Sequence, residues 1–531
     1  MWAAGVAVQE CRERWGASQR CRGFCNWRYM VLRTGSVEMP GAGVTVQECQ
    51  KKMLGAGVGD RILTDRFAHT DKSPDEECQE LYEYCGGTFK GIENNLDYIT
   101  GLGANAIWIS PFIENTELGF HGYWPKNIYE TNPHFGSKQD LKDLIAACQS
   151  RDVWVMADLV LNHMGYPDGC HWSGCPIDNA NNFTGFVPFN DEADYHTYCD
   201  IDWSNEQQEN VEICRLAYLP DLNQTVASVR ETLLNWVREF NAEYGFDGYR
   251  LDFVKGVSKD FLAEVDEASD SFTLGEAYDG RTDYVASYQG YLDSLLSFPM
   301  YFTLEDVFQT FPLGKLTQIH DQLLREADEY QDTSVLGGFL DNHDRKRFLA
   351  NNGNLATLRS ALAYLLMAKW IPIIYYGTEV GFDGGNDPQN RESLWPHYNT
   401  SHELYQFIAD VNTFSRSLGQ NFIDSDQTET TYDDEFYSFT RLDTLVALSN
   451  KGSQTVVERT VTGHGFSNGD VLTNLLDHSD QVTVENDEVR VTLSNGEPKI
   501  YYNGELSGAQ MSKSLRMIVY MTSLCLTSFI L

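Results

Sequence analysis

The chain has 531 residues, of which 42% are hydrophobic and 13% aromatic, so it can build a large core and is neither disordered nor fibrous. Its 39 Lys and Arg residues stand against 77 Asp and Glu residues, which gives a formal net charge of −38. This charge would repel the phosphates of nucleic acids and anionic lipid surfaces, so we exclude nucleic acid as a partner.

Residues 1–57 differ in composition from the rest of the chain. They hold eight basic residues, four acidic residues and four cysteines, and they repeat one phrase, AGVAVQEC ending at Cys11 and AGVTVQEC ending at Cys49. Two copies do not predict a repeat fold. The segment has no basic region followed by an apolar stretch and a small-residue cleavage site, so it does not match a secretory signal. We predict no function for it.

Short apolar runs recur from Asp60 onward, with helical patterns between them. Six of these runs are AIWISPF (106–112), VWVMADLVLNH (153–163), GFDGYRLDFV (245–254), FTLGEAY (272–278), VLGGFLDNHD (335–344) and IPIIYYGTE (371–379). Runs that are apolar on both faces are typical of strands buried on both sides, and their alternation with helices predicts a parallel sheet. This number of units favours an α/β fold closed as a (β/α)8 TIM barrel.

The sequence predicts one connecting helix in detail. Ser137 and Asp140 can cap its first turn. The residues that would share its buried face, at helical spacing, are Leu141, Leu144, Ile145 and Cys148. The pattern therefore predicts a crossover helix with one buried face and makes Cys148 a core thiol.

Polar residues follow several apolar runs at the point where each strand would end. They are Asn162 and His163, Arg250 and Asp252, Glu276, and Asn342, His343 and Asp344. Because the active sites of barrels are built at the carboxyl ends of the strands, this recurrence indicates a functional site. Asp158 lies inside its run, and we interpret it as a buried structural carboxylate.

Three of these residues, Asp252, Glu276 and Asp344, suggest glycoside hydrolysis, in which one carboxylate attacks the anomeric carbon and a protonated one serves the leaving oxygen. Arg250 lies two residues before Asp252, on the same face of the strand, and would keep it ionised as the nucleophile. Glu276 has apolar and aromatic neighbours in sequence, which can raise a carboxyl pKa toward the acid role. The alternative is a set of ion pairs that closes the barrel.

The chain from about Asp60 to Asn503 resembles the α-amylase family of glycoside hydrolases (family 13), and most closely its secreted fungal type. The resemblance is carried by LVLNH (159–163), YRLDFVKG (249–256), GEAYDG (275–280) and FLDNHD (339–344), with ILTDRFA (62–68) and CGGTFKGI (85–92). It implies a retaining mechanism with Asp252 as the nucleophile and Glu276 as the acid/base. Asp344 would be the third carboxylate, which orients the sugar and stabilises the transition state.

The resemblance also implies side chains that bind an α-glucan substrate. His163 and His343 would bind hydroxyls of the sugar being cleaved, and Arg250 would fix the nucleophile. The other implied residues are Lys255 on the leaving-group side, His121, Tyr123 and Trp124 in a segment where an aromatic ring stacks on the sugar, and the substrate-side pair Asp387 and Arg391. An aromatic residue in such a segment could also belong to the core.

Calcium is the cofactor that the resemblance implies, held between the barrel and a loop domain inserted after the third strand. Calcium needs oxygen ligands. The implied ligands are Asn162, Glu212, Asp221 and the main-chain carbonyl of Gly256. Gly256 stands where the fungal enzymes have a histidine, so a side chain that would contact the sugar beyond the cleavage point is missing.

We expect a division into catalytic, inserted and C-terminal parts. Residues 58–163 and 223–427 would form the catalytic barrel, and 164–222 the inserted calcium-binding loop domain. Alternating stretches such as LVALSN (445–450) predict an antiparallel β-sandwich over residues 428–506. Residues 507–531 begin with small residues and end in an uncharged apolar stretch, which predicts either a glycolipid-anchor signal or a retained hydrophobic tail.

Close cysteine pairs favour an oxidising compartment. The pairs are Cys78 with Cys85, Cys170 with Cys175 and Cys199 with Cys214, and glycosylation sequons occur at Asn182, Asn223 and Asn399. Zinc binding or free thiols are the alternative, but the spacing lacks two matched ligand pairs. We expect a secreted or cell-surface glycoprotein, with membrane attachment through a lipid anchor if the tail is a signal, and a monomer.

The leading function is endo-acting hydrolysis of α-1,4-glucosidic bonds in starch-type or glycogen-type glucans. Two alternatives stay open. The same three acids could serve transglycosylation or the remodelling of cell-wall α-glucan. A non-catalytic glucan-binding surface protein could also use this fold, although it would not need all three acids.

Overall fold

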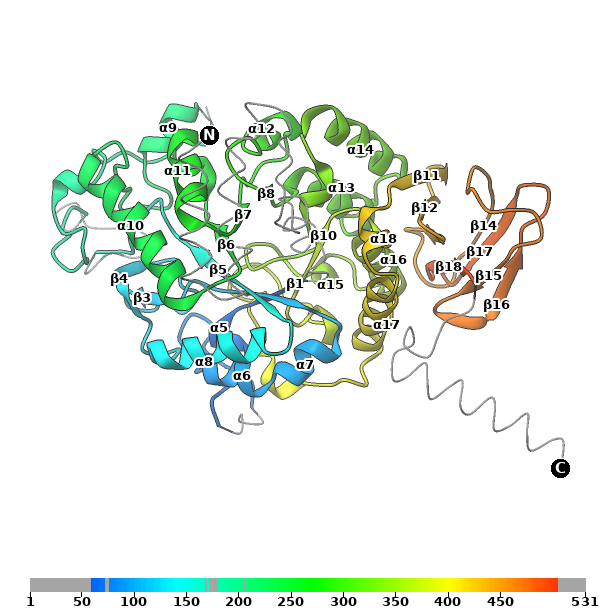
Figure 1. Ribbon diagram of the computed structural model, residues 1–531, viewed down its shortest axis with the longest axis horizontal. Coiled ribbons are helices and arrows are strands. Elements are labelled where there is room, and N and C mark those ends of the chain that lie inside the picture. Colours follow the sequence, from blue (N-terminus) through cyan, green and yellow to red (C-terminus); the bar gives the residue numbers. More distant parts are fainter. Residues whose placement is uncertain (1–58, 72–75, 168–169, 171–179, 205–206, 505–531) are drawn as a thin grey trace, which may run out of the picture.

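The computed structural model describes residues 59–71, 76–167, 170, 180–204 and 207–504. Within them, eight parallel strands form a barrel at the centre of the larger body in Figure 1. In chain order they are β1 (Gly59–Ile62), β2 (Ala106–Ile109), β5 (Trp154–Leu159), β6 (Gly248–Leu251), β7 (Phe272–Gly275), β8 (Ser294–Leu295), β9 (Gly337–Gly338) and β10 (Ile371–Tyr375). The predicted (β/α)8 fold is confirmed.

The barrel closes at a narrow seam. The hydrogen-bonded order of its strands is β8-β7-β6-β5-β2-β1-β10-β9, which leaves β8 and β9 at the two ends. An isolated parallel bridge between Leu296 and Gly337 joins those ends, and the amide of Ser297 donates to the carbonyl of Gly337 at 2.9 Å. Neighbours such as β5 and β6 are instead paired over four residues.

Six of the barrel strands lie inside the predicted apolar runs, and two do not. β8 is two residues long, too short to stand out as a run. β1 reads GDRI and carries Asp60 and Arg61, which are 3% and 1% exposed. These two adjacent charged residues interrupt the apolar pattern, so the sequence did not predict this strand.

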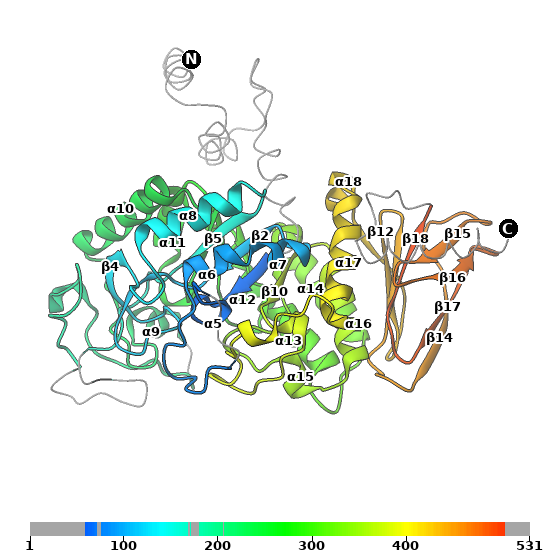
Figure 2. The same cartoon turned by 90° about the horizontal axis from the view of Figure 1, so that it is seen from below.

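The described part of the chain also forms helices, most of which lie around the outside of the barrel (Figures 1 and 2). They are α5 (Thr64–Phe67), α6 (Phe89–Asn94), α7 (Leu96–Gly101), α8 (Lys138–Gln149), α9 (Gln208–Ile213), α10 (Ala227–Tyr244), α11 (Lys259–Ser269), α12 (Thr282–Ala286), α13 (Phe298–Phe308), α14 (Thr317–Glu329), α15 (Phe348–Asn351), α16 (Leu355–Met367), α17 (Glu403–Ser417) and α18 (Gln420–Asp424).

Helix α8 confirms the detailed prediction made for the crossover. The hydroxyl of Ser137 accepts from the amide of Asp140 at 3.2 Å, and the Asp140 carboxylate accepts from the amide of Ser137 at 2.8 Å. The side chains at helical spacing, Leu141, Leu144, Ile145 and Cys148, are all buried, and Cys148 is a free thiol.

An insertion follows β5, the third barrel strand. Its described parts include the short helix α9 and turns, and the disulfide between Cys199 and Cys214 closes one of its loops. An antiparallel bridge between His163 and Asp221 ties the end of the insertion to the residues after β5. A hairpin of β3 (Ile113–Asn115) and β4 (Pro125–Thr131), which the sequence did not predict, joins the insertion through the bridge Asn127–Val187.

Two antiparallel sheets follow the barrel, at the right in Figures 1 and 2. One has the order β11-β12-β13-β18-β15-β16 and the other pairs β14 with β17. Their bounds are β11 (Gln427–Tyr432), β12 (Tyr437–Arg441), β13 (Thr444–Leu448), β14 (Val456–Val461), β15 (Val471–Asn474), β16 (Asp477–Thr483), β17 (Val489–Ser494) and β18 (Lys499–Asn503). Side chains from both sheets, including Leu445, Leu472 and Val491, share one buried cluster, which confirms the predicted sandwich.

Disulfides join Cys78 to Cys85 and Cys199 to Cys214, as predicted, whereas Cys175 lies outside the described residues. None of the helices in the described ranges is long and apolar enough to cross a membrane. The predicted anchor segment 507–531 and the unusual segment 1–57 lie outside those ranges.

Candidate active site

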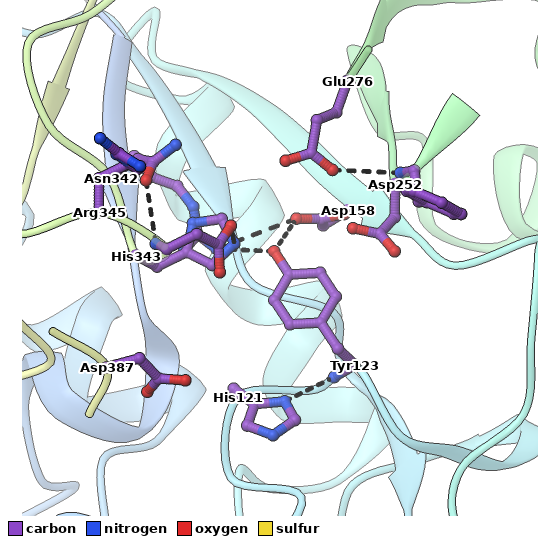
Figure 3. A network of polar contacts seen from close by, with 12 residues as sticks. His121, Tyr123, Asp158, Asp252, Glu276, Asn342, His343, Arg345 and Asp387 are labelled. Atoms are coloured by element: carbon purple, nitrogen blue, oxygen red, sulfur yellow. Dashed lines mark hydrogen bonds and ion pairs between the residues drawn. The ribbon is translucent and has the colours of Figure 1, made fainter. Parts of the chain in front are cut away.

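Asp252, Glu276, Asn342 and His343, which were predicted at strand ends, lie close together in one network of polar contacts (Figure 3). Asp252 directly follows β6, Glu276 directly follows β7, and Asp344 lies six residues after β9. In Figure 3 the carboxyl groups of Asp252 and Glu276 lie near the ring of Tyr123, with Asp387 on the other side of that ring. Segments far apart in sequence therefore supply one cluster of acids.

A buried guanidinium joins two of the three acids. One nitrogen of Arg250, Nη1, lies 2.7 Å from Asp252 Oδ1, and the other, Nη2, lies 2.7 Å from Glu276 Oε2. The side chain of Arg250 is fully buried in β6, and its position two residues before Asp252 places both on one face of the strand. The amide of Phe253 also donates to Glu276 Oε2 at 3.2 Å, which fixes that carboxyl group further.

Asp158 lies beneath this pair and is 2% exposed. Its Oδ1 accepts from Arg250 Nη1 at 2.8 Å, and its Oδ2 accepts from the Tyr123 hydroxyl at 2.7 Å and from Trp108 Nε1 at 3.0 Å. Arg61 donates to the same tyrosine hydroxyl at 2.8 Å and lies 4.6 Å above the Trp108 ring. Asp158, which the sequence predicted to be a buried structural carboxylate, thus holds the side chains of Arg250 and Tyr123 in place.

Asp344 has a different environment from the other two acids. Its Oδ2 lies 2.9 Å from His343 Nε2 and its Oδ1 lies 3.4 Å from Arg391 Nη2. Arg391 Nη1 also lies 3.1 Å from Asp387 Oδ1, so the predicted substrate-side pair is an ion pair. The side chain of Asp344 is 39% exposed, which leaves it open to a ligand from the solvent side.

The protonation of the three acids follows from these contacts. Burial raises the pKa of Asp252 well above its ordinary value and also raises the pKa of Glu276, although Arg250 lowers both. The charge of each carboxyl group disfavours ionisation of the other, so the two groups titrate as a coupled pair. Burial therefore opposes the effect expected of Arg250, whose charge favours the ionised form of Asp252. For Asp344 burial also favours the protonated form, but the bond from His343 and the charge of Arg391 lower its pKa below the ordinary value.

Aromatic and imidazole rings line the floor next to the acids. The rings of Tyr123 and His343 are stacked, with centroids 5.2 Å apart and planes at 7°. His121 Nδ1 accepts from the Tyr123 amide at 3.0 Å, and His163 Nε2 lies 3.1 Å from the Tyr123 carbonyl oxygen. Burial lowers the pKa of His163 and of His343 to about 4, so both rings are neutral at pH 7. Trp124 packs edge-to-face on His121 at 4.5 Å.

Lys255 lies next to the loop that carries Glu276, and it is 4% exposed. Its ammonium group donates to the carbonyl of Tyr278 at 3.1 Å and to Asp279 Oδ2 at 3.2 Å. These bonds connect the short helix after β6, Val254–Gly256, with the loop that carries Glu276.

The structure brings together part of the predicted calcium set. Asn162 Nδ2 donates to Asp221 Oδ1 at 3.0 Å, and His196 Nδ1 lies 2.7 Å from Asp221 Oδ2. Asn162 Oδ1 is buried and has no hydrogen-bond partner in the described part of the chain. A Cβ atom added at Gly256 would lie 2.2 Å from that oxygen and 2.6 Å from the Phe253 ring, so only glycine fits there without a shift.

Glu212 is linked through a shared donor to Lys255, the residue before Gly256. Gln208 Nε2 donates to Glu212 Oε1 at 2.7 Å and to the carbonyl of Lys255 at 3.1 Å. Burial raises the pKa of Asp221 to about 7, against the opposing effect of His196. Within the described ranges no group of three or more His, Cys, Asp or Glu side chains is arranged to hold a metal ion, so a site here would need amide or main-chain oxygens in addition to carboxylates.

Sequence reasoning missed three residues that contact this region. The sequence did not predict the strand that carries Arg61, and Arg345 follows the FLDNHD motif without a pattern that predicts a role for it. His196, the partner of Asp221, stands in a loop without any recurring pattern. A buried position for a charged residue would have been the only signal, and burial cannot be read from one sequence.

Comparisons with known proteins agree with this architecture. The family profile described as "Alpha amylase, catalytic domain" matches residues 61–462. "Alpha-amylase 1" of Schwanniomyces occidentalis is 34% identical over 466 residues, covering 83% of this chain and 88% of that protein. "Alpha-amylase" of Saccharomycopsis fibuligera is 34% identical over 457 residues, covering 83% of this chain and 90% of that protein.

A solved structure shows the same fold. The structure of an α-amylase from Malbranchea cinnamomea superposes with a TM-score of 0.81 at 29% identity, covering 87% of this chain and 100% of that one. The resemblance drawn from the strand-end motifs is therefore confirmed, and the chain is a glycoside hydrolase that belongs to the α-amylase family.

Proposed function

We propose that the protein is an endo-acting, retaining hydrolase of α-1,4-glucosidic bonds in starch-type or glycogen-type glucans. The observation that carries the proposal is the bridge made by Arg250, which holds Asp252 Oδ1 and Glu276 Oε2 at 2.7 Å each. Two carboxyl groups that share one guanidinium lie close together, as a retaining mechanism requires. A third acid, Asp344, follows the strand on the other side of the seam.

The chemistry would proceed in two displacements. Asp252 attacks the anomeric carbon, the glycosidic bond breaks, and Glu276 gives its proton to the leaving oxygen. Glu276 then takes a proton from water, the water oxygen attacks the anomeric carbon, and the ester to Asp252 breaks. The carboxylate of Asp344, whose pKa is held below its ordinary value, would orient the sugar and oppose the positive charge of the transition state.

The remaining residues would bind the glucan around these acids. The stacked Tyr123 and His343 rings offer a flat face to a sugar ring, and the neutral imidazoles of His163 and His343 can hydrogen-bond hydroxyl groups. His121 and Trp124 support Tyr123, Lys255 lies on the leaving-group side, and the Asp387–Arg391 pair borders Asp344.

We further propose a calcium ion bound by Asn162, Glu212, Asp221 and the carbonyl of Gly256. The fit rests on the unpartnered buried Oδ1 of Asn162, on a buried carboxylate at Asp221, and on an oxygen-only donor set. The ion would supply positive charge that fixes the insertion to the residues after β5. Because His163 is adjacent to Asn162 and is bridged to Asp221, metal binding and the shape of the sugar site would be linked.

The wider organisation follows from the same family membership. Residues 58–163 and 223–427 would be the catalytic domain, 164–222 the calcium-binding insertion and 428–506 a stabilising sandwich. The disulfide between Cys199 and Cys214, together with that between Cys78 and Cys85, supports an extracellular location, because such bonds persist in oxidising compartments. Attachment through residues 507–531 can be tested by release of the protein from membranes after truncation before Ser507.

The test is product analysis with the full chain on soluble starch and on maltoheptaose, with calcium present, beside the Asp252→Asn variant. We expect short oligosaccharides of α configuration from the wild type, and at least about 10³-fold lower turnover from the variant with unchanged thermal melting. Near-normal turnover of Asp252→Asn would refute the assignment of the nucleophile. Products longer than the substrate would indicate a transglycosylase, and glucan binding without any product would indicate a binding protein.

A further inference from the structure

Arg345 makes a set of contacts that the proposed reaction does not use. Its Nη1 donates to the hydroxyl of Tyr278 at 3.0 Å, and its Nε donates to the hydroxyl of Tyr301 at 3.0 Å. Its Nη2 lies 2.6 and 2.8 Å from the two carboxylate oxygens of Glu305. One guanidinium thus reaches three side chains, each through a different nitrogen, which is a geometry that only the planar fork of arginine provides.

These contacts connect the two loops that carry acids. Arg345 directly follows Asp344, and Tyr278 lies two residues after Glu276. Glu305 and Tyr301 belong to α13, the helix that follows β8. The guanidinium therefore ties the loop after β9 to the loop after β7, with a helix as the fixed point between them (Figure 3 shows Arg345 next to Asn342 and His343).

These contacts of Arg345 cross the seam between β8 and β9, where the strands of the barrel share the fewest backbone hydrogen bonds. The strands β8 and β9 are joined by the isolated bridge Leu296–Gly337, so few backbone hydrogen bonds hold the β9 side of the site against the β7 side. Asp252 and Glu276 are instead related by continuous pairing of β6 with β7 over four residues and by Arg250. The position of Asp344 relative to Glu276 is consequently held by fewer strand hydrogen bonds than the position of Asp252 relative to Glu276.

Both ends of the tie are held in place by their surroundings. Tyr278 packs against Phe298 at 4.7 Å and against Phe302 at 5.8 Å between ring centroids. The carbonyl of Arg345 accepts from Asn390 Nδ2 at 2.7 Å. The side chain of Arg345 is 31% exposed and that of Glu305 is 14% exposed, so the ion pair is partly shielded from water. The contacts of Arg345 are thus a fixed cross-link and not a surface pairing of mobile side chains.

We propose that Arg345 is a positioning residue for glycoside cleavage, which sets the separation of Asp344 from Glu276 by cross-linking their loops through Tyr278 and Glu305. The inference rests on the proposed function, because it takes Glu276 as the acid/base and Asp344 as the acid that orients the sugar. It predicts an effect on turnover, since a displacement of about 1 Å between catalytic groups can cost on the order of 10²-fold in rate. Binding of the glucan by the stacked rings should change little.

The test compares variants of the full chain on maltoheptaose. Arg345→Met removes every polar contact of the guanidinium while keeping much of its apolar stem, and Tyr278→Phe removes one hydroxyl. Arg345→Lys keeps the charge and can pair with Glu305 but cannot reach all three partners. Lys346→Met is the matched control, because Lys346 is the exposed neighbour and the change also removes one positive charge.

We expect Arg345→Met to lower kcat on the order of tenfold with KM within about twofold of the wild type, and Tyr278→Phe to lower kcat by about threefold. The kcat of the double variant, Arg345→Met with Tyr278→Phe, should match that of Arg345→Met within about twofold, because both substitutions remove the hydrogen bond between these two residues. Arg345→Lys should regain the melting temperature but only part of kcat. Lys346→Met should leave kcat and KM unchanged.

A lower melting temperature for Arg345→Met with wild-type kcat and KM at 25 °C would overturn the proposal and leave Arg345 a stabilising residue only. If Arg345→Met does not fold, Tyr278→Phe decides, and wild-type kcat for it would also overturn the proposal. These results differ from a failure of the proposed function, in which the wild type itself would release no short oligosaccharides.

Discussion

Glu326 allows a stability prediction whose size follows from its surroundings. It lies in α14 and is 2% exposed. Its Oε1 accepts from the Ser297 hydroxyl at 3.0 Å and from Gln322 Nε2 at 3.2 Å. Burial raises the pKa of Glu326 from an ordinary value of 4.5 to about 7, because these two bonds and the nearby charge of Arg325 offset only part of the cost of burying its charge.

The raised pKa makes the folded state bind a proton that the unfolded state releases. Below pH 4.5 the group is protonated in both states and costs nothing. As the pH rises from 4.5 through 7, the free energy of unfolding falls, because the unfolded carboxylate ionises freely and the buried one does not. The difference of about 2.5 between the two pKa values corresponds to a total loss of roughly 3.4 kcal/mol, of which about 2.5 kcal/mol falls between pH 5 and pH 8.

The assay is urea unfolding of the wild type and of Glu326→Gln at pH 5, 6, 7 and 8, with calcium held constant. We expect the free energy of unfolding of the variant to gain about 2.5 kcal/mol on that of the wild type between pH 5 and pH 8, because the amide does not ionise. Glu329→Gln, an exposed position on the same helix, should show no such trend. A difference between Glu326→Gln and the wild type that stays constant within about 1 kcal/mol over this range would refute the reasoning.

Two further predictions concern the insertion. Removal of calcium by a chelator should lower the melting temperature and the activity together, because an ion bound only by the folded state stabilises it; unchanged melting in excess chelator would contradict the calcium site at Asn162 and Asp221. Replacing Cys199 and Cys214 by serine opens a loop of 15 residues and should lower the free energy of unfolding by about 3 kcal/mol in urea. The wild type with this bond reduced should match that variant, and equal stability of oxidised and reduced protein would count against the prediction.

The sequence supported the barrel because its strands carry long apolar runs followed by acids. Asp252 and Glu276 could be found for that reason, since each stands directly after a run that is buried on both faces. The sequence did not predict β8, because a strand of two residues is too short to show an apolar run or an alternating pattern. The residues that hold the site together were also hidden: Arg61 and Arg345 act through partners that are distant in the chain, and only the folded structure shows that Tyr123 and Tyr278 receive their hydrogen bonds.

The protonation of the acids was also beyond the sequence. The spacing of Arg250 and Asp252 indicates an ion pair, and the pair exists at 2.7 Å. The spacing says nothing of how deeply both groups are buried, and it is the burial that raises the pKa of Asp252. A motif therefore identifies which charges meet but not which of them carries a proton.

The seam between β8 and β9 has a consequence for heat inactivation. A single isolated bridge joins β8 and β9, whereas the other neighbouring strands of the barrel share ladders of hydrogen bonds. Local unfolding begins where the fewest backbone hydrogen bonds must break, so we expect it to begin between these two strands. Opening there would move Asp344 away from Asp252 and Glu276 while the other strands stay paired. Activity should then be lost on heating before the circular dichroism of the helices and strands declines, and the lifetime of the enzyme at high temperature would depend on the contact between β8 and β9.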